Sequence, residues 1–387
     1  MRGKPIRVLN NSLALAFEGH ELVIATYALG QDIQDYLPEK FRDAARRIEI
    51  HRVRPGFPID PHRPGMSVGK CVNNLSLYWL ARRLLRKQRF DALICHDADG
   101  MLLGLGLKRR VQLPTIYDMH GSLTELMRNI HGARGLVLDL ARRVERRLYA
   151  GADLILANWP HLTEVIGAGD AAKVCLVQDR PPLTTTESFH VRAGDSQWKR
   201  ENGIDRLLVY AGNYAPYQRV DLLIDMMAIL TKQQVSATLC LIGPGAENLE
   251  SNAQQRPDAD IRFLGPRYGD DLVRILASAD VALSPRVTDN YPPMKVISYL
   301  TAAIPVVGTD CAAHRVMIDD EVTGLLVPAT PEAFADAVAR LLADEALRAK
   351  LGEAAGLQAR GYTMESLATE LRAALSRLPG QAQRPVL

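Results

Sequence analysis

One stretch of the chain, residues 279–309, restricts the fold more than any other. It contains an apolar strand (Ala279–Ser284), a polar turn, a short helix that carries Lys295 and Ser298, and a second apolar strand (Ile304–Val307). A unit of this kind is typical of an open parallel sheet, where the carboxyl ends of the strands meet at one edge and bind ligands. Backbone N–H groups and helix N-termini at that edge favour anions. The sequence therefore predicts an α/β fold that binds an anion, such as a phosphate, beside this turn.

The same alternation of strands and helices occurs twice along the 387 residues. In the first series, apolar segments at Asp91–Asp97, Leu113–Gly121 and Ala152–Trp159 each end in polar residues. Residues 173–188 contain two prolines and three threonines, which predict a linker. A second series of strands and helices begins near residue 206. Two such series indicate two doubly wound, Rossmann-like domains that face a central cleft.

The linker sets the expected domain bounds. We predict an N-terminal domain at residues 1–184 and a C-terminal domain at residues 185–363. A last helix at residues 364–378 is expected to pack back on the N-terminal domain. A Pro/Gly-rich loop at residues 54–70 is followed by a long predicted helix, Asn74–Gln88.

The N-terminal domain opens in an unusual way. Its first residues predict a helix (Val8–Glu18), a Gly-His turn and a strand (Glu21–Tyr27), with no strand ahead of the helix. A doubly wound sheet normally begins with a strand. We therefore expect this domain to lack its first strand, either because the start is truncated or because the domain is built without it.

Charge is distributed unevenly along the chain. Residues 1–185 hold 27 Lys and Arg against 19 Asp and Glu, whereas the remainder holds 20 against 25. Two predicted helices carry basic clusters, at residues 82–89 and 142–147. A basic surface suits an anionic partner such as lipid headgroups, although a solvated basic face has the same composition.

The cysteines and the apolar runs indicate in which cellular compartment the protein is expected. The five cysteines show no metal-ligand spacing, and several lie in apolar runs, which indicates buried, reduced thiols. No run reaches the roughly 18 apolar residues of a membrane span, and no signal peptide is visible. We expect a cytoplasmic protein whose membrane contact is at most peripheral, at the cytoplasmic face, and which has no nucleic-acid partner.

One cationic side chain lies in the polar turn of residues 285–293, and a second follows it. Arg286 offers a planar fork suited to phosphate, and Lys295 lies in the first turn of a helix, where its charge opposes the helix dipole unless an anion is bound. The alternative for Arg286 is an ion pair with Asp280 or Asp289.

Two polar residues of the same block have both a functional and a structural explanation. Asn290 is either a ligand contact or a turn and cap residue. Ser298 either hydrogen-bonds a ribose or back-bonds to its own helix.

Further candidates follow the other strands of the second series. Each glycine-containing turn either only reverses the chain or lets a phosphate approach the backbone closely. Arg267 and Tyr268 follow another strand in the same way. The residues concerned are Gly212, Asn213, Tyr214, Gly243, Gly245, Arg267 and Tyr268.

The first series has its own polar strand ends. His96, Asp97 and Asp99 follow one strand, and His120 follows the next. Asp97 is alternatively a cap of the next helix. Nothing in the sequence completes His96, Asp97 and Asp99 as a ligand set, so we expect no metal site.

The chain resembles the family-4 retaining glycosyltransferases of the GT-B fold. Over residues 206–355 the resemblance is carried by YAGNYAPYQRVDLLIDMMA, LIGPG, IRFLGPRYGDDLVRILASADVALSPR, PPMKVISYLTAAIPVVGTD and EVTGLLVP. In the N-terminal half the similar segments are EGHELVIATY, DALICHDADG, YDMHG and RRVERRLYAGADLILAN.

The resemblance implies transfer of a sugar from a nucleotide-diphosphate donor to an acceptor, with retention and without a metal or a protein nucleophile. Arg286, Lys295 and Arg219 would stabilise the diphosphate as charge develops on it. His120 would lie near the donor sugar, and the nucleobase near Arg267 and Tyr268. His96, Asp97 and Asp99 end the preceding strand at the same edge, so we expect them to contact the acceptor or the sugar.

The sequence departs from the family pattern at two places. Family members often carry two glutamates flanking the block, where this chain has Asn290 and Ser298. Many also place Arg and Lys in the first turn, where this chain has Asn213 and Gln218, followed by Arg219. A subset of the family uses a tyrosine–glutamine turn with an S-P-R…N-x-P-x-K…S-Y block, and this sequence fits that subset.

Two other functions remain open on the sequence alone. The absent first strand and the absent acids would also suit a non-catalytic or partner-dependent binding protein on a degraded GT-B scaffold. A nucleotide-sugar epimerase of the same fold is disfavoured because such enzymes resemble a different block pattern.

Overall fold

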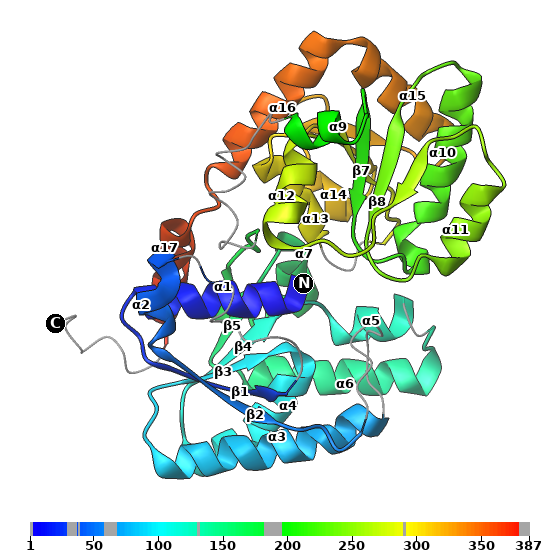
Figure 1. Cartoon of the computed structure of the whole chain (residues 1–387). Helices are drawn as coiled ribbons and strands as arrows, with labels where there is room; N and C mark the ends of the chain where they lie inside the picture. Colours follow the sequence, from blue (N-terminus) through cyan, green and yellow to red (C-terminus); the bar gives the residue numbers. More distant parts are fainter. Residues whose placement is uncertain are drawn as a thin grey trace. The chain divides into compact units, whose positions relative to one another are not determined.

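A computed structural model describes residues 3–28, 37, 39–57, 68–129, 132–181, 196–288 and 292–378 (Figure 1). Two compact units make up the chain. The C-terminal unit is Arg180–Thr363, and the N-terminal unit is Arg2–Asp179 together with Met364–Leu387. None of the helices within the described ranges combines the length and the apolar character needed to cross a bilayer.

The C-terminal unit is built on a six-stranded sheet in the order β12-β11-β10-β7-β8-β9, with every neighbouring pair parallel. The strands are β7 (Leu207–Ala211), β8 (Thr238–Ile242), β9 (Ile261–Phe263), β10 (Val281–Ser284), β11 (Val306–Thr309) and β12 (Gly324–Val327). The helices are α9 (Gln197–Glu201), α10 (Val220–Lys232), α11 (Glu247–Gln254), α12 (Gly269–Ala277), α13 (Met294–Thr301), α14 (Ala312–Arg315), α15 (Pro331–Ala343) and α16 (Glu345–Ala359).

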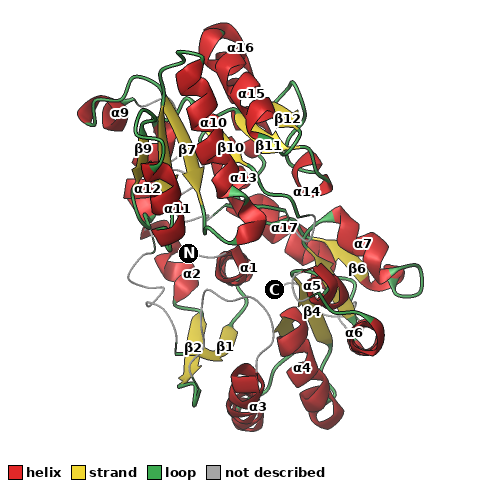
Figure 2. Ribbon diagram, turned by 90° about the vertical axis from the view of Figure 1, so that its right-hand side faces the viewer, coloured by secondary structure: helices red, strands yellow, loops and turns green. Residues whose placement is uncertain are grey.

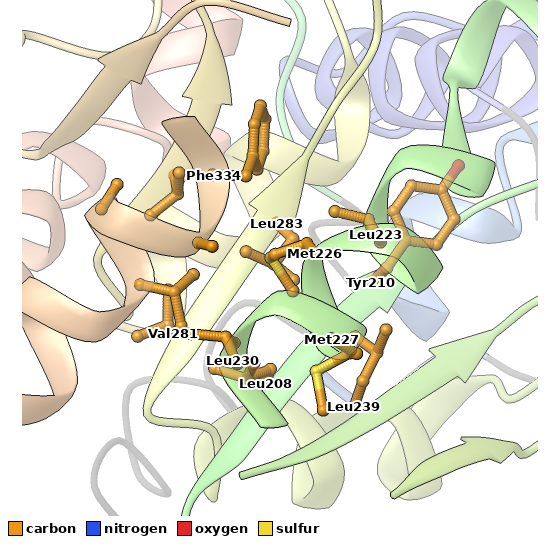
Figure 3. Close-up of a cluster of buried hydrophobic side chains, with 14 of the residues drawn as sticks. Leu208, Tyr210, Leu223, Met226, Met227, Leu230, Leu239, Val281, Leu283 and Phe334 are labelled. Carbon is orange, nitrogen blue, oxygen red and sulfur yellow. The ribbon is translucent and has the colours of Figure 1, made fainter. Parts of the chain in front are cut away.

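Both faces of this sheet are buried because its strands are apolar on both sides. Along β7, Leu208 and Tyr210 pack on one face with α10 and α15, and Leu207 and Val209 pack on the other with α12, α13 and α16. Figure 3 shows the first of these cores, in which Leu208, Tyr210 and Phe334 lie among other apolar side chains. Parallel sheets covered on both faces by helices have this pattern, and the order of the strands is that of a doubly wound fold.

The N-terminal unit holds two sheets. A four-stranded parallel sheet has the order β3-β4-β5-β6, and β1 and β2 form a separate parallel pair. The strands are β1 (Leu22–Tyr27), β2 (Ile48–Val53), β3 (Leu93–His96), β4 (Thr115–Met119), β5 (Leu154–Ala157) and β6 (Val174–Leu176). The helices are α1 (Gly3–Phe17), α2 (Arg42–Ala45), α3 (Val68–Lys87), α4 (Asp97–Val111), α5 (Leu123–Asn129), α6 (Gly135–Gly151), α7 (Pro160–Ile166) and α17 (Met364–Leu375).

Helices cover the four-stranded sheet of the N-terminal unit. α4, α6 and α7 contribute to a core with β3, β4 and β5, and α17 packs on β5 and against α1. Figures 1 and 2 both draw α3, α4 and α6 as neighbouring helices within this unit. Among the described residues, no strand precedes α1 and none joins β1 to β3.

Two helix starts differ from the sequence prediction. α1 begins at Gly3 rather than Val8, because Pro5 lies in the first turn, where a missing N–H costs nothing, and the buried Ile6 extends the apolar face. α3 begins at Val68 rather than Asn74, inside the expected loop. There the buried Asn73 side chain bonds the N–H and C=O of Phe57, at 3.0 and 2.9 Å, and this fixes the early turn.

Candidate functional site

The carboxyl ends of β7, β8 and β9 are tied together by their turns. The N–H of Gly212 donates to the carbonyl of Ile242 at 2.8 Å, and the N–H of Gly243 donates to the carbonyl of Gly265 at 3.1 Å. The Asn213 side chain accepts from the N–H of Ala215 at 3.1 Å, so this residue also shapes its turn. The predicted glycine turns thus form one continuous edge.

Gly243 has no room for a side chain, and Gly212 has little. A Cβ on Gly243 would lie 1.8 Å from the carbonyl oxygen of Gly212. A Cβ on Gly212 would lie 3.2 Å from Nζ of Lys295 and 3.0 Å from the hydroxyl of Tyr210. Gly245 is favoured for another reason: its φ is +81°, a backbone conformation that glycine adopts without strain. The close packing therefore fixes the first two turns against each other and against Lys295.

Replacement of Gly243 by alanine is expected to separate these two turns and to weaken ligand binding at this edge by at least tenfold, because the new methyl group would overlap Gly212. The measurement is the shift in unfolding midpoint that a nucleotide diphosphate produces in the variant. Gly169→Ala is the matched control, since its Cβ would meet no atom within 4 Å. Unchanged binding by Gly243→Ala would show that the two turns need not be in contact.

Lys295 is the second residue of α13 and points to the turn after β7. Its Nζ donates to Oε1 of Gln218 at 2.7 Å and lies 3.9 Å from the centroid of the Tyr210 ring. Within the described ranges, no carboxylate forms an ion pair with it. Burial and the nearby Arg286 hold the pKa of its amino group well below the ordinary value of 10.5. This arrangement leaves a cationic group that an anion would stabilise.

Arg286 is 1% exposed and is the second residue after β10. Its Nε donates to the carbonyl of Thr288 at 3.0 Å, and its Nη2 donates to the Thr288 hydroxyl at 2.8 Å. The guanidinium carbon lies 5.7 Å from the centroid of the Tyr217 ring. Asp280, one suggested partner, pairs with Lys199 at 2.9 Å instead.

Two residues of the predicted turn, Asp289 and Asn290, lie outside the described residues. The suggested Arg286–Asp289 pair and the role of Asn290 therefore stay predictions. Ser298 is half-buried, and its hydroxyl makes no hydrogen bond within the described ranges, whereas Thr301 makes the helix back-bond at 2.7 Å. The expected ribose contact of Ser298 therefore stays a prediction.

Three tyrosines support this edge: Tyr214, which was predicted, and Tyr210 and Tyr299, which were not predicted as site residues. The Tyr210 hydroxyl donates to the carbonyl of Asn213 at 2.6 Å, and the Tyr299 hydroxyl accepts from the N–H of Ala211 at 2.7 Å. Tyr214 stacks on Tyr210, with ring centroids 6.1 Å apart. The buried hydroxyls of Tyr214 and Thr309 have no partner among the described residues. Unpaired buried hydroxyls at a strand edge are natural contacts for a ligand.

Three other predicted residues do not contact Lys295 or Arg286 among the hydrogen bonds and ion pairs of the described residues. Arg219 has φ +50° at the start of α10, and its Nε donates to the carboxylate of Asp221 at 3.2 Å. Arg267 is exposed, and so is Tyr268, at 62%. The structure therefore gathers Gly212, Asn213, Tyr214, Gln218, Arg286 and Lys295 around the turns after β7 and β10.

The N-terminal unit brings the two predicted histidines together on a residue that was missed, Asp118 of β4. Nδ1 of His96 lies 2.9 Å and Nε2 of His120 lies 3.2 Å from the same Asp118 oxygen. Asp118 was detectable as a lone acid in the apolar strand TIYDM, two residues before His120. Asp97 is the first residue of α4, with φ +64°, and not its N-cap, which is His96. Asp99 lies in the same first turn.

His96, Asp118 and His120 offer ligand atoms within 4.8 Å of one another, so their geometry would allow a metal ion. This set is not the trio of His96, Asp97 and Asp99 that the sequence analysis weighed. Asp118 also accepts hydrogen bonds from Arg7 and Asn11. Because a guanidinium already faces this carboxylate, we interpret the cluster as a hydrogen-bond network.

Family models match most of the chain. Residues 3–177 match the model described as "Glycosyl transferase 4-like domain", and residues 205–344 match "Glycosyl transferases group 1". These matches cover both units and include His96, His120, Arg286 and Lys295.

Curated relatives and solved structures agree with these models. The chain is 27% identical to a D-inositol 3-phosphate glycosyltransferase of Corynebacterium glutamicum, over 95% of this chain and 90% of the relative. It is 24% identical to a phosphatidyl-myo-inositol mannosyltransferase of Mycobacterium leprae, over 79% and 78%. Its fold matches sucrose-phosphate synthase of Thermosynechococcus elongatus, with a TM-score of 0.78, 17% identity and coverage of 97% and 94%. It also matches Anabaena HepE in complex with UDP-glucose, with a TM-score of 0.71, 15% identity and 98% coverage of both chains.

Proposed function

The chain belongs to the family-4 glycosyltransferases of the GT-B fold, and from this premise we propose that it transfers a sugar, with retention, from a nucleotide-diphosphate donor held at the carboxyl edge of the C-terminal sheet. The observation that carries this proposal is Lys295, a half-buried amino group whose Nζ lies against the glycine turn after β7 and has no carboxylate partner among the described residues. A diphosphate there would supply the negative charge that the described residues do not give it.

The chemistry needs the leaving diphosphate to be stabilised as its charge grows. Lys295 and Arg286 supply preorganised positive charge, and the turns at Gly212 and Gly243 allow close approach of the backbone. The bond between the anomeric carbon and the leaving phosphate oxygen breaks, and the acceptor oxygen bonds to that carbon on the same face. The acceptor proton passes to the leaving phosphate, so the reaction needs neither a metal nor a protein nucleophile.

Other predicted residues complete the proposal. Ser298 and Asn290 are proposed to contact the ribose, and Arg267 and Tyr268 to lie beside the base. Arg219 is proposed to turn from Asp221 to the diphosphate. In the N-terminal unit, His120 is proposed to contact the transferred sugar, with His96, Asp97 and Asp99 on the acceptor side.

Thermal unfolding with UDP, GDP and ADP tests the donor site directly. A nucleotide at about 100 times its dissociation constant stabilises the folded protein by about 2.7 kcal/mol. We expect one of the three to raise the unfolding midpoint and thereby to identify the base. No shift with any of the three would count against a working donor site and would favour a binding protein on a degraded scaffold.

The acceptor is proposed to be an anionic, lipid-linked molecule at the cytoplasmic membrane face. Two relatives are named for inositol phosphate and phosphatidylinositol acceptors. On α6, Leu136 and Leu140 are 87% and 60% exposed, and Arg143 and Arg147 continue the same stripe at helical spacing. On α3, Trp79 is 58% exposed, with the Arg82 guanidinium 5.0 Å from its ring centroid. Exposed apolar and basic residues on one helix face are typical of contact with an anionic bilayer.

Vesicle flotation measures this contact. We expect the wild-type protein to bind vesicles that contain an anionic lipid, and binding to vesicles of phosphatidylcholine alone to be much weaker. The double variant Leu136→Asp/Leu140→Asp should lose at least tenfold in affinity, because both apolar side chains leave the bilayer. Leu357→Asp, on α16 of the C-terminal unit and 49% exposed in the wild type, is the matched control. Equal binding by both variants would remove the α6 surface from the proposal.

A further inference from the structure

Arg7 of α1 is a buried cation that no part of the proposed reaction uses directly. Its side chain is 2% exposed. Nε and Nη2 donate to the same oxygen of Asp118, at 2.9 and 2.7 Å. Nη1 donates to the carbonyl of Val177 and to the carboxylate of Asp179, at 2.8 and 2.9 Å. One guanidinium thus connects α1 to the end of β4 and to the segment after β6.

Asp118 is completely buried. Within the described residues, side chains of the same unit donate hydrogen bonds to both of its carboxylate oxygens. One oxygen accepts from Arg7, and the other accepts from Asn11, His96 and His120. Burial alone would raise the pKa of Asp118, but the Arg7 guanidinium and His120 hold it well below its usual range. The carboxylate therefore stays ionised and can only accept hydrogen bonds.

An ionised Asp118 fixes which ring nitrogens of the histidines carry protons. Nε2 of His120 faces the carboxylate and must donate, so in the neutral ring Nδ1 holds the lone pair. His120 is 6% exposed, and its Nδ1 is buried without a hydrogen-bond partner in the part of the chain that the structure describes. A buried acceptor of this kind suits a hydroxyl group of a bound ligand.

We propose that Arg7 is a positioning residue that, through Asp118, holds His120 in the tautomer whose free Nδ1 accepts a hydrogen bond from a substrate sugar hydroxyl. The proposal rests on the proposed role of His120 in sugar transfer. Loss of Arg7 would leave Asp118 buried without its main counter-charge, and a protonated or rotated Asp118 would no longer specify the tautomer. Arg7 itself need not touch the substrate.

The test combines kinetics with ¹⁵N NMR of the histidine rings, on the full chain, for Arg7→Met and Arg7→Lys. In the wild type we expect His120 to be protonated at Nε2, and in Arg7→Met we expect a mixture of tautomers. In Arg7→Met, kcat should fall about 10- to 100-fold, the loss that follows removal of a residue that orients a metal-binding histidine, while the nucleotide-induced shift in unfolding midpoint stays unchanged. Arg7→Lys keeps the charge and should recover part of both effects.

Arg372→Met is the matched control, because Arg372 pairs with Glu18 on the surface of the same unit and is 63% exposed. It should change neither the tautomer nor kcat. A folded Arg7→Met with the wild-type tautomer, or with the wild-type kcat, would overturn the proposal. If Arg7→Met does not fold, Arg7→Lys and Asp118→Asn are judged by the same two measurements. If no donor sugar is transferred at all, the proposed function fails, but the NMR measurement still decides the role of Arg7.

Discussion

Replacement of Lys295 by methionine is expected to remove nucleotide-diphosphate binding and, at the same time, to stabilise the ligand-free protein. Loss of one preorganised donor to a developing oxyanion typically lowers the rate by about 10²–10³, and we expect transfer to fall by that factor. The opposite effect on stability follows from the environment of the amino group. Tyr210 and Gln218 desolvate it, and no described carboxylate compensates its charge. An apolar side chain of similar length avoids this cost, and we expect a gain of about 1 kcal/mol in the free energy of unfolding.

The pH dependence of Lys295 has a definite sign. Its pKa in the folded protein is lowered by burial and by Arg286, from an ordinary 10.5. Between the lowered value and 10.5 the unfolded state binds more protons, so the wild-type protein becomes more stable as pH rises through this window. Bound diphosphate favours the protonated amine, so nucleotide affinity should fall as pH rises through the same lowered pKa. Lys295→Met should show neither slope.

Thermal unfolding at several pH values, with and without the nucleotide, measures the effects on binding and stability, and an assay of sugar transfer measures the effect on the rate. Lys232→Met is the control, because Lys232 is exposed at the end of α10. It should keep the nucleotide shift and both slopes. A Lys295→Met protein that still responds to the nucleotide as the wild type does would show that the diphosphate binds elsewhere.

Much of the C-terminal candidate site could be predicted, because its residues come soon after apolar strands that are recognisable in the sequence. Gly212 and Gly243 follow an apolar strand directly, and Arg286 is the second residue after one. Parallel strands bring their carboxyl ends to one edge. Lys295 was identified by its conflict with the helix dipole, a property of local sequence alone. Two doubly wound series and their helices were predicted for the same reason, since apolar periodicity is a local signal.

The hydrogen-bond network that holds His96 and His120 could not be predicted in this way. Arg7 and Asp118 are 111 residues apart, and only the packing of α1 on the sheet brings them together. The sequence predicted an amphipathic helix only at Val8–Glu18, so Arg7 lay just outside it. An arginine at such a place is ordinarily solvated, so its burial depends on a distant carboxylate. The separate pairing of β1 with β2 was likewise not predictable from the strand patterns, because pairing is set by tertiary packing rather than by the strand itself.

Replacement of His120 by alanine should remove transfer but keep nucleotide binding, whereas Lys295→Met should remove both. His120 belongs to the N-terminal unit, whereas the proposed nucleotide contacts belong to the C-terminal unit. The nucleotide-induced shift in unfolding midpoint should therefore persist, while kcat falls by about 10²-fold or more, as for loss of a positioned hydrogen-bonding or proton-transferring side chain. His161→Ala is the control, because His161 lies in the same unit, outside the proposed site, with its Nε2 hydrogen-bonded to Glu125 at 2.8 Å. A His120→Ala enzyme with at least half of the wild-type kcat would exclude a sugar contact at Nδ1, and a lost nucleotide shift would mean that His120 supports donor binding rather than the transfer step.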